Sequence, residues 1–226
     1  MPRQVKRIIG STFPHLPVLM LILLPGFVLM KGSASHPAAP LNLASQLQEE
    51  QLRAGDLIFR KGISLVSRLV QVADQQTVYT HVGIIVDYEG EKRVVHAVPA
   101  EEPDGIDRVK MESLTEFLQP GRAVELGIYR YKGAAGPDPA DAARWAVGKA
   151  LAAVPFDKSF DLQDNAALYC TELIWKAYLE AGIDLCEGEF DRLPLSLRQE
   201  HYILPGRIIS NTHLTPIIHL PKTTDL

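Results

Sequence analysis

The 226-residue sequence predicts an α+β domain built on a mostly antiparallel sheet. A hairpin is the first observation: residues 81–86 and 93–98 form two apolar arms around a polar turn at Glu89 and Gly90. A helix at 168–181, with apolar residues at helical spacing, is the second. Since helices and strands follow one another in mixed order, we expect the sheet to pack against this helix.

Residues 1–34 differ from the rest of the chain. Arg3, Lys6 and Arg7 precede an apolar run at 16–30, and small residues follow at 32–35. This layout is typical of a secretory signal peptide, with cleavage after Ala34, or of an N-terminal membrane anchor. Either one predicts an exported protein that is periplasmic or membrane-anchored, with its domain outside the cytoplasm.

Composition narrows the class of function. With 46% apolar residues the chain has enough hydrophobic material for one globular domain. Residues 1–34 contain four basic and no acidic side chains, so the remainder carries 19 basic against 27 acidic ones. A domain of this negative charge is not expected to bind nucleic acid.

The other elements follow in order. We expect a linker at 35–52, a folded domain at 53–212 and a C-terminal tail at 213–226. Within the domain, Ser113 and Glu116 have capping-box spacing, and Asp138 before Pro139 is typical of a helix start. The remaining predicted elements are strands at 57–59, 124–131 and 202–210, and helices at 64–73, from Ser113 to about 120, and at 138–153.

Cys170 lies in the first turn of the helix at 168–181 and on its apolar stripe, so its sulfur is expected to face the sheet. Backbone N–H groups and the positive end of the helix dipole favour a thiolate there, which predicts a lowered pKa, and the same N–H groups can hold an oxyanion. Glu172, Lys176 and Glu180 recur at intervals of four and predict an exposed ladder of opposite charges. The alternatives are a buried unreactive thiol, or a disulfide with Cys186 in a non-catalytic binding module that keeps the fold without turnover.

His81 is the candidate base for this thiol. It opens a strand that is otherwise apolar, and imidazole has a pKa near neutrality. Gly83, two residues further on the same face, leaves space for a neighbour. A structural core histidine is the alternative.

His96 lies on the second arm of the hairpin, and the register decides its role. If Glu89 and Gly90 form a two-residue turn, His81 and His96 become diagonal neighbours on one face. His96 can then orient the base as the third member of a triad, whereas a shift by one residue places it on the other face.

A zinc site made of the same Cys and His residues is disfavoured, because the sequence has no closely spaced CxxC or HxxxH pair. We therefore predict no metal and no cofactor.

Three blocks of the sequence carry a family resemblance: Ala54-Gly55-Asp56-Leu57-Ile58-Phe59, Thr80-His81-Val82-Gly83-Ile84-Ile85 and Tyr169-Cys170-Thr171-Glu172-Leu173-Ile174. In this order they resemble the permuted papain-like amidases, the YiiX/YebB-like branch of the NlpC-type cysteine hydrolases. The resemblance implies a circularly permuted papain-like fold in which the histidine strand precedes the cysteine helix.

The resemblance also implies roles. Cys170 matches the nucleophile and His81 the base, while His96 stands where the family often has an acid and the related lecithin retinol acyltransferase branch has a histidine. Tyr169 and Thr171, beside the nucleophile, are candidates for contacting the substrate or the oxyanion, with packing as the alternative for Tyr169. Such enzymes act through an acyl-enzyme on amide bonds of cell-wall peptides, or on acyl groups of lipids. A peptide or a lipid acyl group is thus the expected substrate, and the N-terminal segment is a possible membrane contact.

Overall fold

A computed structural model describes residues 42–99, 107–133, 135–192 and 201–221. All of them belong to one compact unit, Ala39–Leu226. Its elements in chain order are η1 (Ala44–Gln46), η2 (Glu49–Gln51), β1 (Leu57–Lys61), α1 (Leu65–Ala73), β2 (His81–Tyr88), β3 (Glu91–Val98), β4 (Arg108–Ser113), α2 (Leu114–Phe117), β5 (Glu125–Tyr131), α3 (Pro139–Leu151), α4 (Cys170–Glu180), α5 (Pro205–Ile209) and β6 (Leu214–Leu220).

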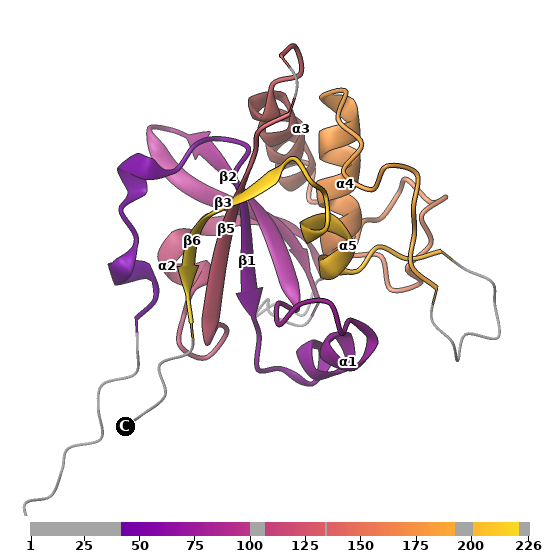
Figure 1. Cartoon of the computed structure of the whole chain (residues 1–226), viewed down its shortest axis with the longest axis horizontal. Coiled ribbons are helices and arrows are strands. Elements are labelled where there is room, and N and C mark those ends of the chain that lie inside the picture. Colours follow the sequence, from indigo (N-terminus) through magenta and orange to yellow (C-terminus); the bar gives the residue numbers. More distant parts are fainter. Residues whose placement is uncertain (1–41, 100–106, 134, 193–200, 222–226) are drawn as a thin grey trace, which may run out of the picture. The chain divides into compact units, whose positions relative to one another are not determined.

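The strands form one six-stranded sheet in the order β4-β3-β2-β1-β5-β6. Every neighbouring pair is antiparallel. Figure 1 shows this sheet with α3 and α4 on one side and α2 near its other side. The predicted α+β class and antiparallel sheet are confirmed.

Two apolar cores cover the two faces of the sheet, because side chains alternate along each strand. On one face Val82 and Ile84 pack with Leu173 and Ile174 of α4. On the other face the sheet packs with α2 and with Leu43 of the N-terminal part of the domain. The helix that bears Cys170 therefore lies against one face only.

The β2–β3 hairpin has the predicted two-residue turn. Glu89 and Gly90 both adopt positive φ, 52° and 82°, and Tyr88 pairs with Glu91 on either side of them. Two consecutive left-handed residues match the twist of the flanking strands. This turn fixes which residues of β2 and β3 face each other.

Two predicted helix starts are confirmed. The Asp138 side chain accepts a hydrogen bond from the Ala140 N–H at the start of α3. Ser113 and Glu116 form the capping box of α2. In both cases a side chain satisfies a backbone donor that the helix itself leaves without a partner.

The end of the chain corrects two predictions. Residues 205–209 form helix α5 instead of part of a strand at 202–210, because Pro205 occupies the first helical turn, where no N–H is needed. The predicted tail at 213–226 contains β6, which pairs with β5 at the edge of the sheet. The folded domain thus extends to at least Leu220.

The start of the domain corrects a third prediction. The linker expected at 35–52 contains η1 and η2, and its Leu43 and Leu52 are buried in the core. Strand β4, which the sequence did not predict, pairs with β3. The segment expected to be a signal peptide or anchor, 1–34, lies outside the described residues.

Within the residues that the structure describes, no helix combines the length and the apolar character needed to cross a bilayer.

Candidate active site

The two histidines of the hairpin form a buried pair. His81 is the first residue of β2, and His96 lies on β3, one pairing step beyond Ile84 and Val95. His81 Nε2 and His96 Nδ1 are 2.8 Å apart. The diagonal arrangement that the sequence predicted for a two-residue turn is therefore confirmed.

Gly83 keeps this part of the hairpin close-packed. A Cβ at this position would lie 2.5 Å from Val94 Cγ1 and 3.3 Å from His96 Cβ. Any side chain here would displace the strand that carries His96, so the absence of one is a condition for the imidazole pair.

Glu112 on β4 extends the pair to a series of three residues. Its Oε1 lies 3.0 Å from His96 Nε2, a close polar contact, and neither atom has a hydrogen bond of standard geometry to any described group. Its Oε2 contacts Lys110 Nζ at 2.9 Å and Arg122 Nη1 at 3.2 Å. Burial raises the pKa of Glu112, but the contacts with His96 and Lys110 outweigh it and bring the pKa to about 2. The carboxyl group is therefore ionised at neutral pH.

The sequence reasoning missed Glu112. The signal was present in the alternation of Val109 and Met111 with Lys110 and Glu112, which is typical of a strand with a polar face. Once β4 is placed beside β3, residue 112 comes near His96 across the sheet.

Ionised Glu112 orders the protons of the series. Because the ionised Glu112 carboxylate can only accept, His96 Nε2 must carry the hydrogen. Neutral His96 then has a lone pair on Nδ1. That lone pair accepts from His81 Nε2–H, so neutral His81 keeps its lone pair on Nδ1. The network thus assigns Nδ1 of His81 as the available base.

Both imidazoles are held neutral by their surroundings. Burial lowers the pKa of His81 well below its usual value, and Arg60, His96 and Lys110 lower it further. Burial likewise lowers the pKa of His96, although Glu112 opposes the effect. Arg60 pairs with His81 across β1 and β2, donates to the Phe117 carbonyl at 2.7 Å and stacks over the Phe117 ring.

Cys170 is the first residue of α4 and is half-buried. The backbone N–H groups of Thr171, Val82 and Cys170 itself lie within hydrogen-bond reach of its sulfur. The thiol therefore sits at the start of β2, next to the residue that bears the candidate base. The expected position at a helix start, facing the sheet, is confirmed.

The expected pKa of Cys170 is corrected. Burial raises the pKa of the thiol above its ordinary value and outweighs the lowering effect of the three N–H groups. The helix start alone suggested a thiolate, whereas burial favours the neutral thiol, and the candidate base on β2 is a neutral imidazole. Such a pair needs proton transfer at the moment of attack.

The side chains of Tyr169 and Thr171, on either side of Cys170, both form hydrogen bonds with the backbone of Ile203. The Tyr169 hydroxyl accepts from the Ile203 N–H at 3.0 Å, and the Thr171 hydroxyl donates to the Ile203 carbonyl at 2.5 Å. Both side chains are buried. Their hydroxyls hold the residues on either side of Cys170, so the candidate contact to an oxyanion at these positions is the backbone N–H of Thr171. Substrate contact by Tyr169 or Thr171 stays a prediction.

Glu172 was expected on an exposed ladder, and this is wrong: its side chain is fully buried. It accepts from the Tyr169 N–H at 3.2 Å, which completes a capping box, and pairs with Lys176 Nζ at 2.7 Å. Burial raises the pKa of Glu172 to about 7, although Lys176 lowers it.

Other uses of these residues find little support. Cys170 and Cys186 are both free thiols, so the disulfide of the alternative interpretation is not formed. Across the described ranges, no group of three or more His, Cys, Asp or Glu side chains is placed to hold a metal ion. His96 in particular has both ring nitrogens engaged, with His81 and with Glu112.

Comparisons with known proteins agree on fold and family. The family model described as permuted papain-like amidase enzyme, YaeF/YiiX, C92 family, matches residues 51–191. The crystal structure of the metalloprotein yiiX from Escherichia coli O157:H7 is similar with a TM-score of 0.61 and 22% identity, over 76% of this chain and 99% of that one. No curated protein matches. The predicted permuted papain-like fold is that of these proteins.

Proposed function

Because the chain belongs to the permuted papain-like amidase family, we propose that it is a cysteine hydrolase in which Cys170 forms an acyl-enzyme on an amide substrate. One observation carries the proposal: His81, His96 and Glu112, joined by polar contacts of 2.8 Å and 3.0 Å, form a series that ends at the strand position beside the Cys170 thiol. Ordered imidazoles next to a thiol at a helix start are the parts that nucleophilic catalysis requires.

In the proposed first step the Cys170 sulfur attacks the amide carbonyl carbon, and its proton passes to His81 Nδ1. The carbonyl π electrons move to oxygen, and the backbone N–H groups at the start of α4 stabilise the oxyanion. His96 accepts from the new imidazolium, and Glu112 accepts from His96. The positive charge on His81 is therefore stabilised by the Glu112 carboxylate, two polar contacts away.

In the second step the oxyanion collapses, the C–N bond breaks, and His81 returns its proton to the leaving amine. A thioester remains on Cys170. His81 then takes a proton from water, whose oxygen attacks the thioester carbonyl, and the proton passes to the Cys170 sulfur as it leaves. Release of the carboxylic acid restores the neutral thiol and imidazole.

We propose amide bonds of cell-wall peptides as the substrate. The basic, apolar and small residues of 1–34 support export into a compartment that contains such peptides. Hydrolysis or transfer of lipid acyl groups is the second candidate, and the specific observation in its favour is the exposed apolar face of α1.

Metal chemistry enters no step of this proposal. The similar yiiX structure is titled a metalloprotein, but the described side chains of this chain offer no group of three ligands, and the His96 nitrogens are already engaged. The residues present do not fit a metal site.

An electrophilic thiol probe tests the nucleophile. We expect labelling of the wild type at Cys170 and none in Cys170→Ala. Cys186→Ala is the matched control, because burial raises the pKa of Cys186 to about 12 and makes it unreactive. Labelling that survives in Cys170→Ala would overturn the proposal.

Substrate class is tested by giving the full chain short murein peptides, phospholipids and acyl amides in parallel. We expect turnover of the peptides, lost in Cys170→Ala and kept in Cys186→Ala. Turnover of phospholipid alone would replace the first candidate by the second.

The relay is tested by Glu112→Gln, which keeps the shape and removes the charge. We expect kcat to fall by about 10- to 100-fold, as for other carboxylates that orient a functional histidine. Since the pKa of His81 lies well below its usual 6.5, the wild-type kcat/KM should decline on the acid side only below pH 6.5. An acid limb at or above 6.5, or an unchanged kcat in Glu112→Gln, would contradict the relay.

A further inference from the structure

Helix α1 turns its apolar face away from the protein. None of its nine residues is buried. Leu65 is 74%, Leu69 64% and Val72 75% exposed, and Val66 is exposed beside them. These positions recur at helical spacing, so they form one stripe.

The polar side of α1 faces inward instead. A Cβ at Gly62 would lie 2.2 Å from Ser67 Oγ, which shows how closely this side approaches the chain before it. Gln71 donates to the Thr77 carbonyl at 3.0 Å in the segment that follows. A surface helix normally has the opposite orientation, with its apolar stripe against the core.

The exposed apolar residues are concentrated in this one segment. Of nine large hydrophobic side chains exposed in the described chain, six lie between residues 63 and 78: Ile63, Leu65, Val66, Leu69, Val72 and Val78. Concentrated exposure of this kind marks a surface that meets a protein, a ligand or a membrane.

The charges around the stripe favour one occupant. Between residues 61 and 80 the basic side chains are Lys61, which lies 3.9 Å from Glu125, and the exposed Arg68, and the single acid, Asp74, is buried. The chain as a whole is acidic, at a net charge of −4. The exposed Arg68 beside an apolar helix face, with no exposed acid between residues 61 and 80, matches an anionic lipid surface better than a second copy of this acidic protein.

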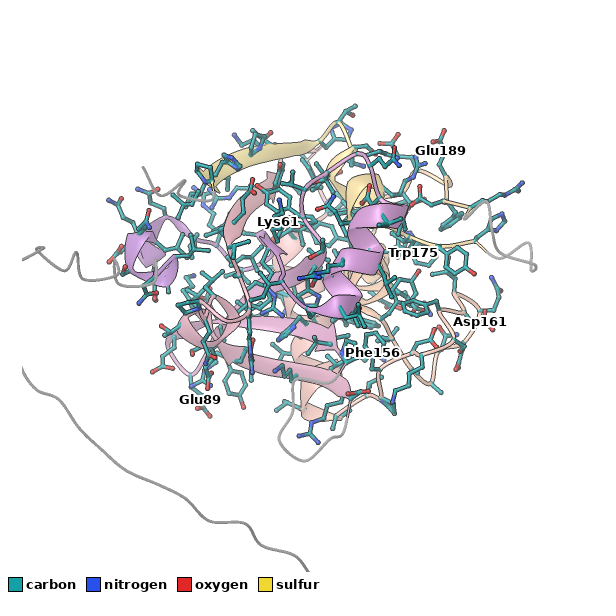
Figure 2. All side chains as sticks on the ribbon, turned by 90° about the horizontal axis from the view of Figure 1, so that it is seen from below. Lys61, Glu89, Phe156, Asp161, Trp175 and Glu189 are labelled. Carbon is teal, nitrogen blue, oxygen red and sulfur yellow. The ribbon has the colours of Figure 1, made fainter. Side chains whose placement is uncertain are left out.

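This face lies at the end of the sheet that bears the candidate active site. Figure 1 places α1 beyond the tip of β1, and Figure 2, seen from that end, shows it in front of the sheet, with Lys61 labelled. Asp74, which ends α1, accepts from the Gly206 N–H at 2.6 Å at the start of α5. Three residues before Gly206, Ile203 binds Tyr169 and Thr171, on either side of Cys170.

We propose that α1 is an interfacial membrane helix, which lays its apolar face into the surface layer of an anionic bilayer and presents the Cys170 end of the domain to that surface. A short helix of this kind needs a second membrane contact in the same protein, because a single weak contact gives only reversible binding. The N-terminal apolar run at 16–30 is the candidate for the other. The proposal does not rest on the proposed reaction.

A tryptophan placed on α1 of the full chain tests the contact. Leu69→Trp and, as control, Leu179→Trp at the end of α4 away from Cys170 are each mixed with vesicles of phosphatidylglycerol and phosphatidylcholine that carry brominated acyl chains. Both leucines are exposed, and the emission of Trp145 and Trp175 in the wild type is subtracted. Circular dichroism checks that both variants fold.

We expect the emission of the residue 69 tryptophan to shift to the blue and to be quenched at least twofold more than that of residue 179. Equal quenching at both positions, or none at residue 69, would overturn the proposal. A blue shift that needs no vesicles and grows with protein concentration would assign the face to a second copy and overturn it as well. Neither experiment requires turnover. A failed vesicle experiment would overturn only the membrane proposal, and a failed thiol-probe experiment would overturn only the proposed function.

Discussion

Helices α4 and α1 have similar sequence patterns and opposite environments. Each is short and has apolar residues on one face. In α4 that face is buried, with Leu173 and Ile174 fully covered by the sheet. In α1 the corresponding face is open and the polar side is turned inward. An apolar stripe therefore identifies a face that needs cover, but not what covers it.

The largest expected difference between the two helices is in stability. Leu173→Ala on α4 should lower the free energy of unfolding by about 2–5 kcal/mol, because it leaves a cavity in a close-packed core. Leu69→Ala on α1 should change it by less than about 0.5 kcal/mol. Urea unfolding of the two variants measures both, and a loss of similar size at residue 69 would show that α1 is covered by the protein itself.

The two helices should also differ in pH dependence. Because the pKa of Glu172 rises from 4.5 to about 7 on folding, its ionisation opposes the folded state. Its contribution to stability is most favourable below pH 4.5, declines as the pH rises to about 7 and is constant above. The decline is at most about 3 kcal/mol.

The difference in unfolding free energy between the wild type and Glu172→Gln, measured from pH 4.5 to 7.5, isolates this effect. Leu69→Ala should leave the same profile unchanged, since the exposed stripe of α1 carries no titrating carboxylate. A flat difference for Glu172→Gln would mean that Lys176 keeps the carboxylate ionised throughout.

A smaller effect concerns how α4 is anchored. Tyr169→Phe removes the acceptor of the buried Ile203 N–H, and we expect a loss of about 1–3 kcal/mol in unfolding free energy. Reactivity of Cys170 toward a thiol probe should change with it, because the same backbone unit holds Thr171. Unchanged stability would indicate that water replaces the hydroxyl.

The smallest expected effect is on α1. Arg68→Gln should weaken partition of the full chain onto anionic vesicles by about fivefold, since a basic residue near such a surface contributes about 1 kcal/mol. Stability should not change, because Arg68 is exposed. Vesicle sedimentation measures the partition, and the same weakening with purely zwitterionic vesicles would argue against a charge effect.

Local patterns predicted much of the fold and two of the three residues of the polar series, His81 and His96. The alternation of 81–86 and 93–98 and the turn residues fixed the hairpin, and the hairpin register alone brought His81 to His96. The helix spacing placed Cys170 correctly at the start of α4. These features depend on neighbours in sequence, which a periodic pattern records.

The features that were missed depend on distant neighbours. Glu112 reaches His96 because β4 pairs with β3, and the raised pKa of Cys170 comes from burial that no local pattern contains. Residues 205–209 looked like a strand because their apolar residues suit either state, and Pro205 at a helix start decided the outcome. Short apolar runs are ambiguous in this way.

The chain order of the family has a consequence in time. Strands β1 to β5, which contain His81, His96 and Glu112, are complete at Tyr131, whereas Cys170 comes later and β6 ends only at Leu220. During synthesis the N-terminal part of a chain is made first and can fold first. The imidazole pair can therefore form before Cys170 is in place, so that in each newly made molecule the candidate nucleophile is the last of these side chains to join the folded domain.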